Sequence, residues 1–232
     1  MKKNILILIV AVVIIAAAFG GYYFWQKDTN NAEHDINPMD LLVFEIKIDS
    51  LTDYQKERAF TRFNNAKNII NQNNSEENEE VRNNINFFPW LEVAGAQKII
   101  GDYERSAQVL IWFTDVHSGN SVSPANLGNL YKSFLVDNEK SEKYYKIALE
   151  RDPDDWQIYF GFFDLYRYNF DDPDKAIAVM QDGAKNNPDE KNYVVTLANY
   201  LIELERIQEA EVIINDFVAR HPEAGSLRDK LK

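Results

Sequence analysis

The side chains best suited to metal binding or proton transfer are few in this chain, and they lie far apart along it. There are three histidines, His34, His117 and His221, and there is no cysteine. A helical zinc site such as HExxH needs two histidines four residues apart, and that spacing does not occur. The glycine-rich loops that bind phosphates and the GxSxG motif that positions a nucleophilic serine are also missing. The sequence therefore predicts no metal, no cofactor and no catalytic residue, and we expect a protein that is not an enzyme.

Carboxylates crowd two short segments, residues 152–155 (DPDD) and residues 171–174 (DDPD). Loops rich in carboxylates can bind calcium, but the spacing of an EF-hand loop is absent from both segments. Aspartate also accepts hydrogen bonds from the first backbone N–H groups of a helix. We therefore expect both segments to cap helices.

The charge of the chain limits its partners. It carries 37 acidic and 25 basic side chains, a formal net charge of -12. An acidic surface repels the phosphates of nucleic acids and the headgroups of anionic lipids. We therefore expect a protein partner and no nucleic acid.

The first 25 residues predict a membrane anchor. Residues 5–25 (ILILIVAVVIIAAAFGGYYFW) are an uncharged run of 21 residues that ends in four aromatic side chains, which favour a membrane interface. As a helix this run spans roughly 31 Å and matches the hydrocarbon core of a bilayer. Because Lys2 and Lys3 precede it, the positive-inside rule keeps the N-terminus in the cytoplasm and places the rest of the chain outside the inner membrane. The alternative is a signal peptide cleaved near residues 16–18 (AAA), which leads to the same compartment.

Residues 26–50 predict a spacer with one short extended segment. Within it, residues 41–48 (LLVFEIKI) end in an alternation of apolar and charged side chains, which indicates a short strand or an extended arm. A helix is expected over residues 52–72, where Thr52 and Gln55 are placed for a capping box. Residues 73–84 are rich in Asn and Glu, and we expect them to form a solvated loop.

Residue types recur along the rest of the chain with a period of 34 or 35 residues. Repeats of this length are typical of stacked helix pairs, in which each unit covers the apolar face of its neighbour. The recurring positions are the prolines Pro153, Pro188 and Pro222, the small residues Ser106, Ser141, Ala176 and Ala210, the series Phe113, Ala148, Gly183 and Phe217, and the pairs that begin at Val93, Leu127, Phe162 and Leu197. Since these series hold one phase, we expect four copies of one structural unit.

The repeats resemble the tetratricopeptide repeat (TPR) family. Residues 127–131 (LGNLY) look like the first helix of that repeat, and residues 141–153 (SEKYYKIALERDP) look like its second helix and closing turn. The resemblance covers about residues 88–223, and the helix at 52–72 looks like an unpaired second helix, a degenerate half-repeat. It implies an all-α fold for residues 51–232, a right-handed superhelix of antiparallel helix pairs preceded by the transmembrane helix. Ser118 stands where the first repeat would carry its proline, so we expect an irregular turn there.

In the TPR family the first helices line a concave groove that binds extended peptides or partner helices. The resemblance implies that eight side chains of this chain line such a groove: Asn129, Lys132, Phe160, Asp164, Arg167, Tyr168, Asn199 and Glu203. Phe160, Arg167 and Tyr168 lie in an aromatic run, and Tyr and Arg are enriched at interface hot spots. The alternative is that these three side chains only cover the neighbouring repeat.

These features predict a membrane-anchored scaffold that recruits another protein at the extracytoplasmic side of a bacterial inner membrane. Two alternatives stay open, an accessory or regulatory subunit of an envelope enzyme and a self-assembling envelope protein. The Lys/Asn/Arg set with which some TPR proteins clamp a peptide carboxylate is not reproduced, so we do not expect binding of chaperone C-termini.

Overall fold

The computed structural model describes residues 37–231 and divides the chain into two compact units, residues 1–44 and 45–232. In the first unit the described residues include one 3-10 turn, η1 (Pro38–Leu41), which begins where the Asn37 side chain accepts a hydrogen bond from the Met39 N–H at 3.1 Å. The predicted anchor and residues 26–36 of the spacer lie outside the described residues. Within the described residues, no helix combines the length and the apolar character needed to cross a membrane.

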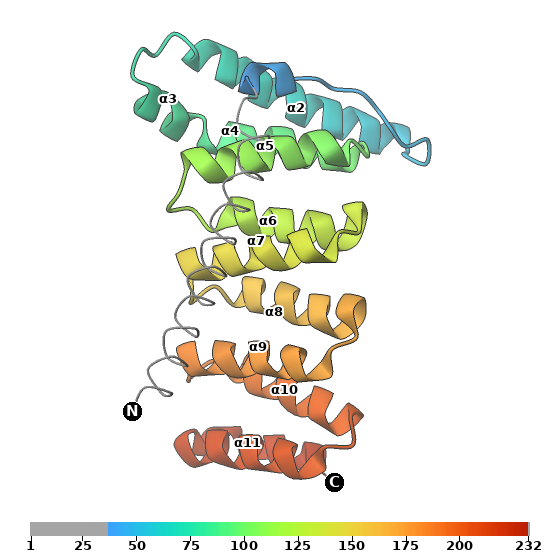
Figure 1. Ribbon diagram of the computed structural model, residues 1–232, viewed down its shortest axis with the longest axis vertical. Coiled ribbons are helices and arrows are strands. Elements are labelled where there is room, and N and C mark those ends of the chain that lie inside the picture. The colour runs from blue at the N-terminus through green and yellow to red at the C-terminus, as the bar shows by residue number, and fades with distance from the viewer. Residues whose placement is uncertain (1–36, 232) are drawn as a thin grey trace, which may run out of the picture. The chain divides into compact units, whose positions relative to one another are not determined.

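The second unit is built of helices and turns (Figure 1). Its α-helices are α2 (Asp53–Asn73), α3 (Glu79–Ile85), α4 (Phe87–Ile99), α5 (Tyr103–Val116), α6 (Val122–Leu130), α7 (Asn138–Arg151), α8 (Trp156–Asp164), α9 (Pro173–Asn186), α10 (Lys191–Glu203) and α11 (Ile207–Arg220). Two π-helical turns, η2 (Tyr131–Leu135) and η3 (Leu165–Phe170), extend α6 and α8, and the 3-10 segment η4 (Pro222–Leu231) follows α11. No strand occurs between residues 37 and 231, so the predicted all-α class is confirmed for the described chain.

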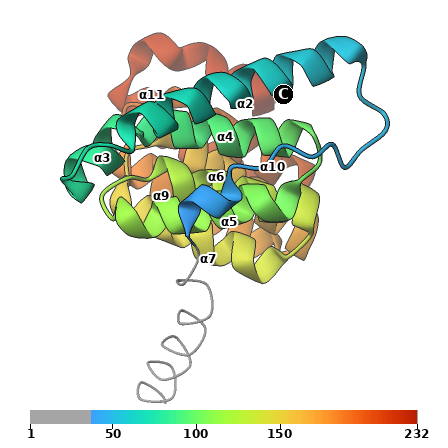
Figure 2. The ribbon, with the colours of Figure 1, turned by 90° about the horizontal axis from the view of Figure 1, so that it is seen from above.

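The helices of this unit pack as consecutive pairs. The pairs are α4 with α5, α6 with α7, α8 with α9 and α10 with α11, and the second helix of each pair also packs against the first helix of the next. Figure 1 shows this succession of helices, and Figure 2 shows the same helices overlapping in a view from above. α2 packs against α4. The consecutive pairing of helices predicted from the period is therefore present from α4 to α11.

Small side chains let the two helices of a pair approach closely. The Ser106 hydroxyl donates to the Ala94 carbonyl at 2.8 Å, and the Ser141 hydroxyl donates to the Gly128 carbonyl at the same distance. A Cβ atom added to Gly128 would lie 2.9 Å from ring atoms of Tyr145, which is fully buried. Interiors are packed too densely to absorb such an overlap, so the small residues set the spacing of the helix pairs.

Each second helix ends in the same way. The N–H of the residue after the helix donates to the carbonyl four residues earlier at 2.9 to 3.1 Å, in the bonds His117 to Phe113, Asp152 to Ala148, Asn187 to Gly183 and His221 to Phe217. The turn without a proline, after α5, has additional support from the next repeat. One guanidinium nitrogen of Arg151 donates to the carbonyls of Thr114, His117 and Asn120 at 2.9 to 3.3 Å.

The first helices end in a residue with left-handed backbone conformation, and two of them contain one extra residue before it. These residues are Gly101, Val136, Asp171 and Glu205, with φ between 52° and 82°. Gly101 is the seventh residue after Ala94, whereas Val136 is the eighth residue after Gly128. The extra residue is absorbed by η2, and η3 does the same in the third repeat. Single π turns of this kind are frequent at functional sites.

Three expectations concern residues 41–84. The expected loop over residues 73–84 is wrong from Glu79 onward, because α3 begins there: the Asn78 side chain accepts from the Val81 N–H at 3.1 Å, and Glu79 and Glu80 favour a helix N-terminus electrostatically. The capping box of α2 at Thr52 and Gln55 is confirmed. Residues 42–48 are in no helix or strand, although the Lys47 N–H donates to the Ile100 carbonyl at 2.8 Å.

Candidate protein-binding face

The eight predicted groove residues lie on three consecutive first helices. Asn129 is on α6 and Lys132 on its π extension, and the others are Phe160 and Asp164 on α8, Arg167 and Tyr168 on η3, and Asn199 and Glu203 on α10. Most of them contact the neighbouring first helix, and they gather into two groups, one between the second and third repeats and one between the third and fourth.

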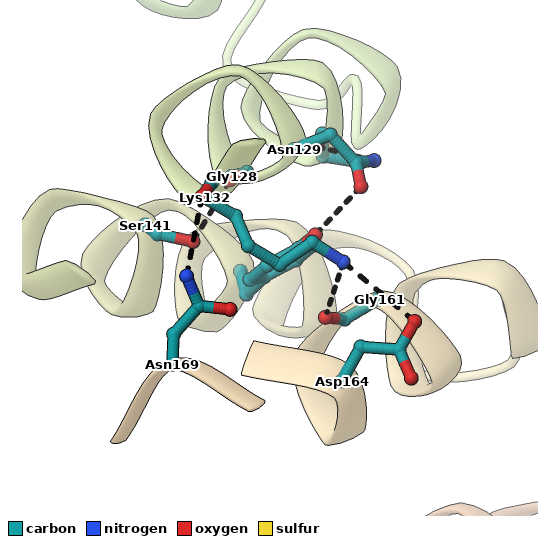
Figure 3. Close-up of polar contacts among 9 residues, drawn as sticks. Gly128, Asn129, Lys132, Ser141, Gly161, Asp164 and Asn169 are labelled. Carbon is teal, nitrogen blue, oxygen red and sulfur yellow. Dashed lines mark hydrogen bonds and ion pairs between the residues drawn. The ribbon is translucent and has the colours of Figure 1, made fainter. Parts of the chain in front are cut away.

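Lys132 is the centre of the first group (Figure 3). Its ammonium lies 3.2 Å from the Gly161 carbonyl and 3.8 Å from the nearer carboxylate oxygen of Asp164, both on α8. The Asn169 side chain donates back to the Lys132 carbonyl at 3.2 Å. Burial lowers the pKa of Lys132, and Asp164 partly opposes that shift. Because its ammonium already has two partners, Lys132 joins two repeats instead of pointing freely to a ligand.

Two hydrogen bonds within the chain orient the Asn129 side chain. Its side-chain carbonyl accepts a hydrogen bond from the Tyr145 hydroxyl at 2.7 Å, and its amide donates to the Ala125 carbonyl at 3.2 Å. Burial is the main reason that the pKa of Tyr145 is raised, so its hydroxyl stays a donor. Asn129 is nevertheless exposed, and the two bonds fix the orientation in which it meets the solvent.

Arg167 is the centre of the second group. Its guanidinium donates to Glu203 on α10 at 2.6 Å and lies over the rings of Tyr168 and Tyr200, 4.7 and 4.8 Å from their centroids. The Tyr168 side chain is 66% exposed, whereas Tyr200 is buried. Stacking on a guanidinium restricts the Tyr168 ring before any ligand arrives. We refer to Arg167, Tyr168, Tyr200 and Glu203 as the Tyr168 platform.

The remaining two predicted residues also have partners within the chain. Phe160 is half-buried, with its ring 5.6 Å from that of Trp156 and 5.8 Å from that of Tyr193 on the next first helix. The Asn199 side chain accepts from the Lys230 ammonium at 3.0 Å. For Phe160 the contacts favour the alternative that it covers the neighbouring repeat. Of the two aromatic residues in the predicted set, Tyr168 is the exposed one.

The two acidic turns act as helix caps. The Asp155 side chain accepts from the Gln157 N–H at 2.8 Å at the start of α8, and the Asp172 side chain accepts from the Lys175 N–H at 3.0 Å at the start of α9. The capping role predicted for both segments is therefore confirmed. Between residues 37 and 231, no group of three His, Asp or Glu side chains is placed to hold a metal ion.

Two apolar surfaces were not predicted. Phe134 and Val136, at the end of η2, are 43% and 73% exposed, and the Phe134 ring lies 4.7 Å from that of Tyr103. The other surface is a groove between α2 and α4 that includes the exposed rings of Tyr54 and Phe88. The sequence did contain a signal for the groove, namely the expected unpaired second helix at residues 52–72. A second helix without its first helix leaves part of its apolar surface uncovered.

No family model matches this chain, and no curated protein matches it. Among solved structures it is similar to MamA: a double mutant of MamA from strain RS-1 is 13% identical, with a TM-score of 0.49, over 81% of this chain and 97% of that one. A MamA fragment from Desulfovibrio magneticus RS-1 is 14% identical with a TM-score of 0.46, over 71% of this chain and 96% of that one. MamA from strain AMB-1 is 14% identical with a TM-score of 0.44, over 77% and 97%. Likeness at this level carries no argument about function.

Proposed function

We propose that the protein is a non-catalytic scaffold that binds a segment of another protein on the face formed by its first helices. The observation that supports this proposal is the Tyr168 platform, in which Arg167 joins α8 to α10 and holds the exposed ring of Tyr168. Tyr and Arg carry much of the binding energy at protein interfaces. A ring that is already restricted loses less conformational entropy on binding, which favours affinity.

The bonds between repeats support the same role. Lys132 joins α6 to α8, and Arg167 joins α8 to α10, at equivalent places 35 residues apart. Both lie in π turns, which place the two cations at the junctions between repeats. These links hold the spacing of the first helices, and a fixed spacing lets one extended ligand contact several repeats at once.

We further propose that residues 5–25 anchor the scaffold in a bacterial inner membrane, with the repeats on the extracytoplasmic side. The uncharged run and the two lysines ahead of it support this proposal. Because the chain has no cysteine, Gly119→Cys gives a single thiol at a position with open space around it. A maleimide that cannot cross membranes should label this thiol in intact spheroplasts. Labelling that requires lysis would refute the orientation.

Site-specific crosslinking tests the binding face. A photoreactive residue replacing Tyr168 in the full chain should capture a protein in the membrane, and the same residue replacing Val212 should not capture it. Val212 is a matched control because it is 68% exposed and lies on a second helix, α11. In the complementary experiment, Tyr168→Ala should weaken co-purification of the captured protein about tenfold or more. Equal capture from both positions, or undiminished co-purification, would refute the assignment of this face.

A further inference from the structure

The groove between α2 and α4 has a volume of about 900 Å³. Its rim includes Tyr54 and Phe88, which are 70% and 74% exposed, and Ile69, which is 44% exposed. Large apolar side chains exposed together mark a surface that another molecule covers. The repeat register of this chain identifies what kind of molecule that is.

α2 has the residue pattern of a second helix. Its residues Ala59, Phe63 and Ala66 are all buried, with exposed fractions of 0 to 3%. They have the same spacing as Ser141, Tyr145 and Ala148 on α7, which are also fully buried. This correspondence fixes the register of α2 against the second helices of the repeats.

The α2 wall of the groove is the side with which a second helix covers its own first helix. In this register Arg62 corresponds to Tyr144, whose ring stacks on Tyr131 of its own first helix at 5.7 Å. Asn65 corresponds to Trp112, whose ring packs on that of Trp90 on α4 at 4.8 Å. Arg62 and Asn65 line the groove and have no first helix of their own among the described residues.

The α4 wall leads to the same conclusion. Pro89 corresponds to Tyr193, whose ring lies 5.8 Å from that of Phe160 on the preceding first helix. Glu92 corresponds to Gly161, whose carbonyl accepts from Lys132 of the preceding first helix at 3.2 Å. Arg62 and Glu92 also pair with each other across the groove. The wall residues correspond to side chains that contact a first helix in other repeats, so by register the groove corresponds to the place of the first helix of α2.

We propose that this groove binds one amphipathic helix of a partner protein, which completes the half-repeat of α2. The complete first helices α4 and α10 are 13 residues long, which indicates the length of the ligand. It needs a small residue where it approaches Ala66 of the α2 wall, as Gly128 is small where α6 approaches α7, and an apolar stripe toward Ile69 and Phe88. The Glu92 carboxylate already accepts from the Arg62 guanidinium of α2 at 2.9 Å, so a basic side chain one turn after the small residue would share this carboxylate with Arg62.

A peptide of residues 121–136, which contains α6 and η2, is a defined probe because it carries these features at Gly128 and Lys132. Fluorescence anisotropy with the full chain in detergent micelles should show saturable binding with a Kd on the order of 0.1 mM, since a short free helix must order as it binds. A Gly128→Leu peptide should bind at least about tenfold more weakly, because the larger side chain keeps the helix from approaching α2.

Variants of the protein locate the binding. Phe88→Ala should weaken binding of the peptide about tenfold or more, and the matched control Val212→Ala should leave it unchanged. Tyr168→Ala should also leave it unchanged, so the failure of this proposal is distinct from failure of the Tyr168 platform. Absence of saturable binding up to about 1 mM, or equal binding by Phe88→Ala, would overturn the proposal.

The nature of the occupant is tested by a photoreactive residue at Thr61, an exposed position in the α2 wall. With the peptide present, the crosslink should join Thr61 to the peptide. A crosslink to residues 1–36 of the same chain, or to a second copy of the protein, would show that the groove is filled by another occupant, and it would overturn the commitment to a partner helix.

Discussion

A methyl group added at Gly183 would collide with a buried ring. Gly183 lies in α9, and a Cβ atom there would be 2.3 and 2.8 Å from two ring carbons of Tyr193 on α10 and 3.1 Å from Cγ of Tyr159 on α8. Tyr193 is fully buried, so its ring has no free space in which to turn away. The substitution must therefore move α9 away from α10.

The size of the effect follows from two opposing contributions. Overpacking of a dense core costs about 1–3 kcal/mol, and replacing Gly by Ala inside a helix returns up to about 1 kcal/mol. We expect Gly183→Ala to lose about 1 kcal/mol, which for a unit of this size lowers the Tm by roughly 2–4 °C. Gly183→Leu adds a larger side chain at the same place, so we expect a loss of up to about 3 kcal/mol and a Tm lower by roughly 6–12 °C.

Gly95→Ala is the matched control, because Gly95 also lies inside a helix. The three heavy atoms nearest to a Cβ atom there are guanidinium atoms of Arg62, at 2.9 to 3.2 Å. This guanidinium binds Glu92, but both side chains are partly exposed and flexible, so the pair can shift together. Thermal melts followed by circular dichroism should show no loss for Gly95→Ala. The combination of Gly183→Ala with Tyr193→Leu should lose less than the sum of the two single variants, because the smaller side chain removes the collision. An unchanged Tm for Gly183→Leu would refute the reasoning.

Two further predictions concern the turn between α5 and α6. Arg151→Met removes the donor to three carbonyls of that turn and should lower the Tm by several degrees, equivalent to about 1–3 kcal/mol. The control Lys146→Met changes an exposed residue and should have little effect. Equal Tm values for the two variants would contradict the idea that Arg151 stabilises the turn. Burial lowers the pKa of His117, so below about pH 6.5 the unfolded chain binds more protons and stability falls. Between pH 7.5 and pH 5.5 the Tm of His117→Phe should therefore decrease less than that of the wild type, and identical decreases would exclude His117 as a cause.

The period, the pairing of helices and several caps could be predicted from the sequence, because each depends on spacing along the chain. Small residues that recur every 34 or 35 positions indicate that the two helices of each pair approach closely in every repeat. A Thr-x-x-Gln start can be recognised within four residues, as at Thr52. The start of α3 was missed because its short pattern lies in a polar segment, and Asn78 can serve a loop as well as a helix cap.

The roles of the predicted binding residues depended on tertiary structure. Residue type and repeat position placed Lys132 and Arg167 on the first helices, but their partners lie 29 to 36 residues further along the chain. Likewise, one extra residue in a repeat can form a bulge, a longer loop or a π turn, and only the packing of α6 and α8 decided in favour of η2 and η3.

The sequence by itself determined that this chain forms helices that must stack, since each helix pair has an apolar face that water would otherwise meet. Only the tertiary structure decided which side chains remain available, because an ammonium or an aromatic ring is free or engaged according to distances of a few ångströms between repeats. For that reason Lys132 became a link between helices, Tyr168 stayed exposed, and an uncovered groove was found beside α2.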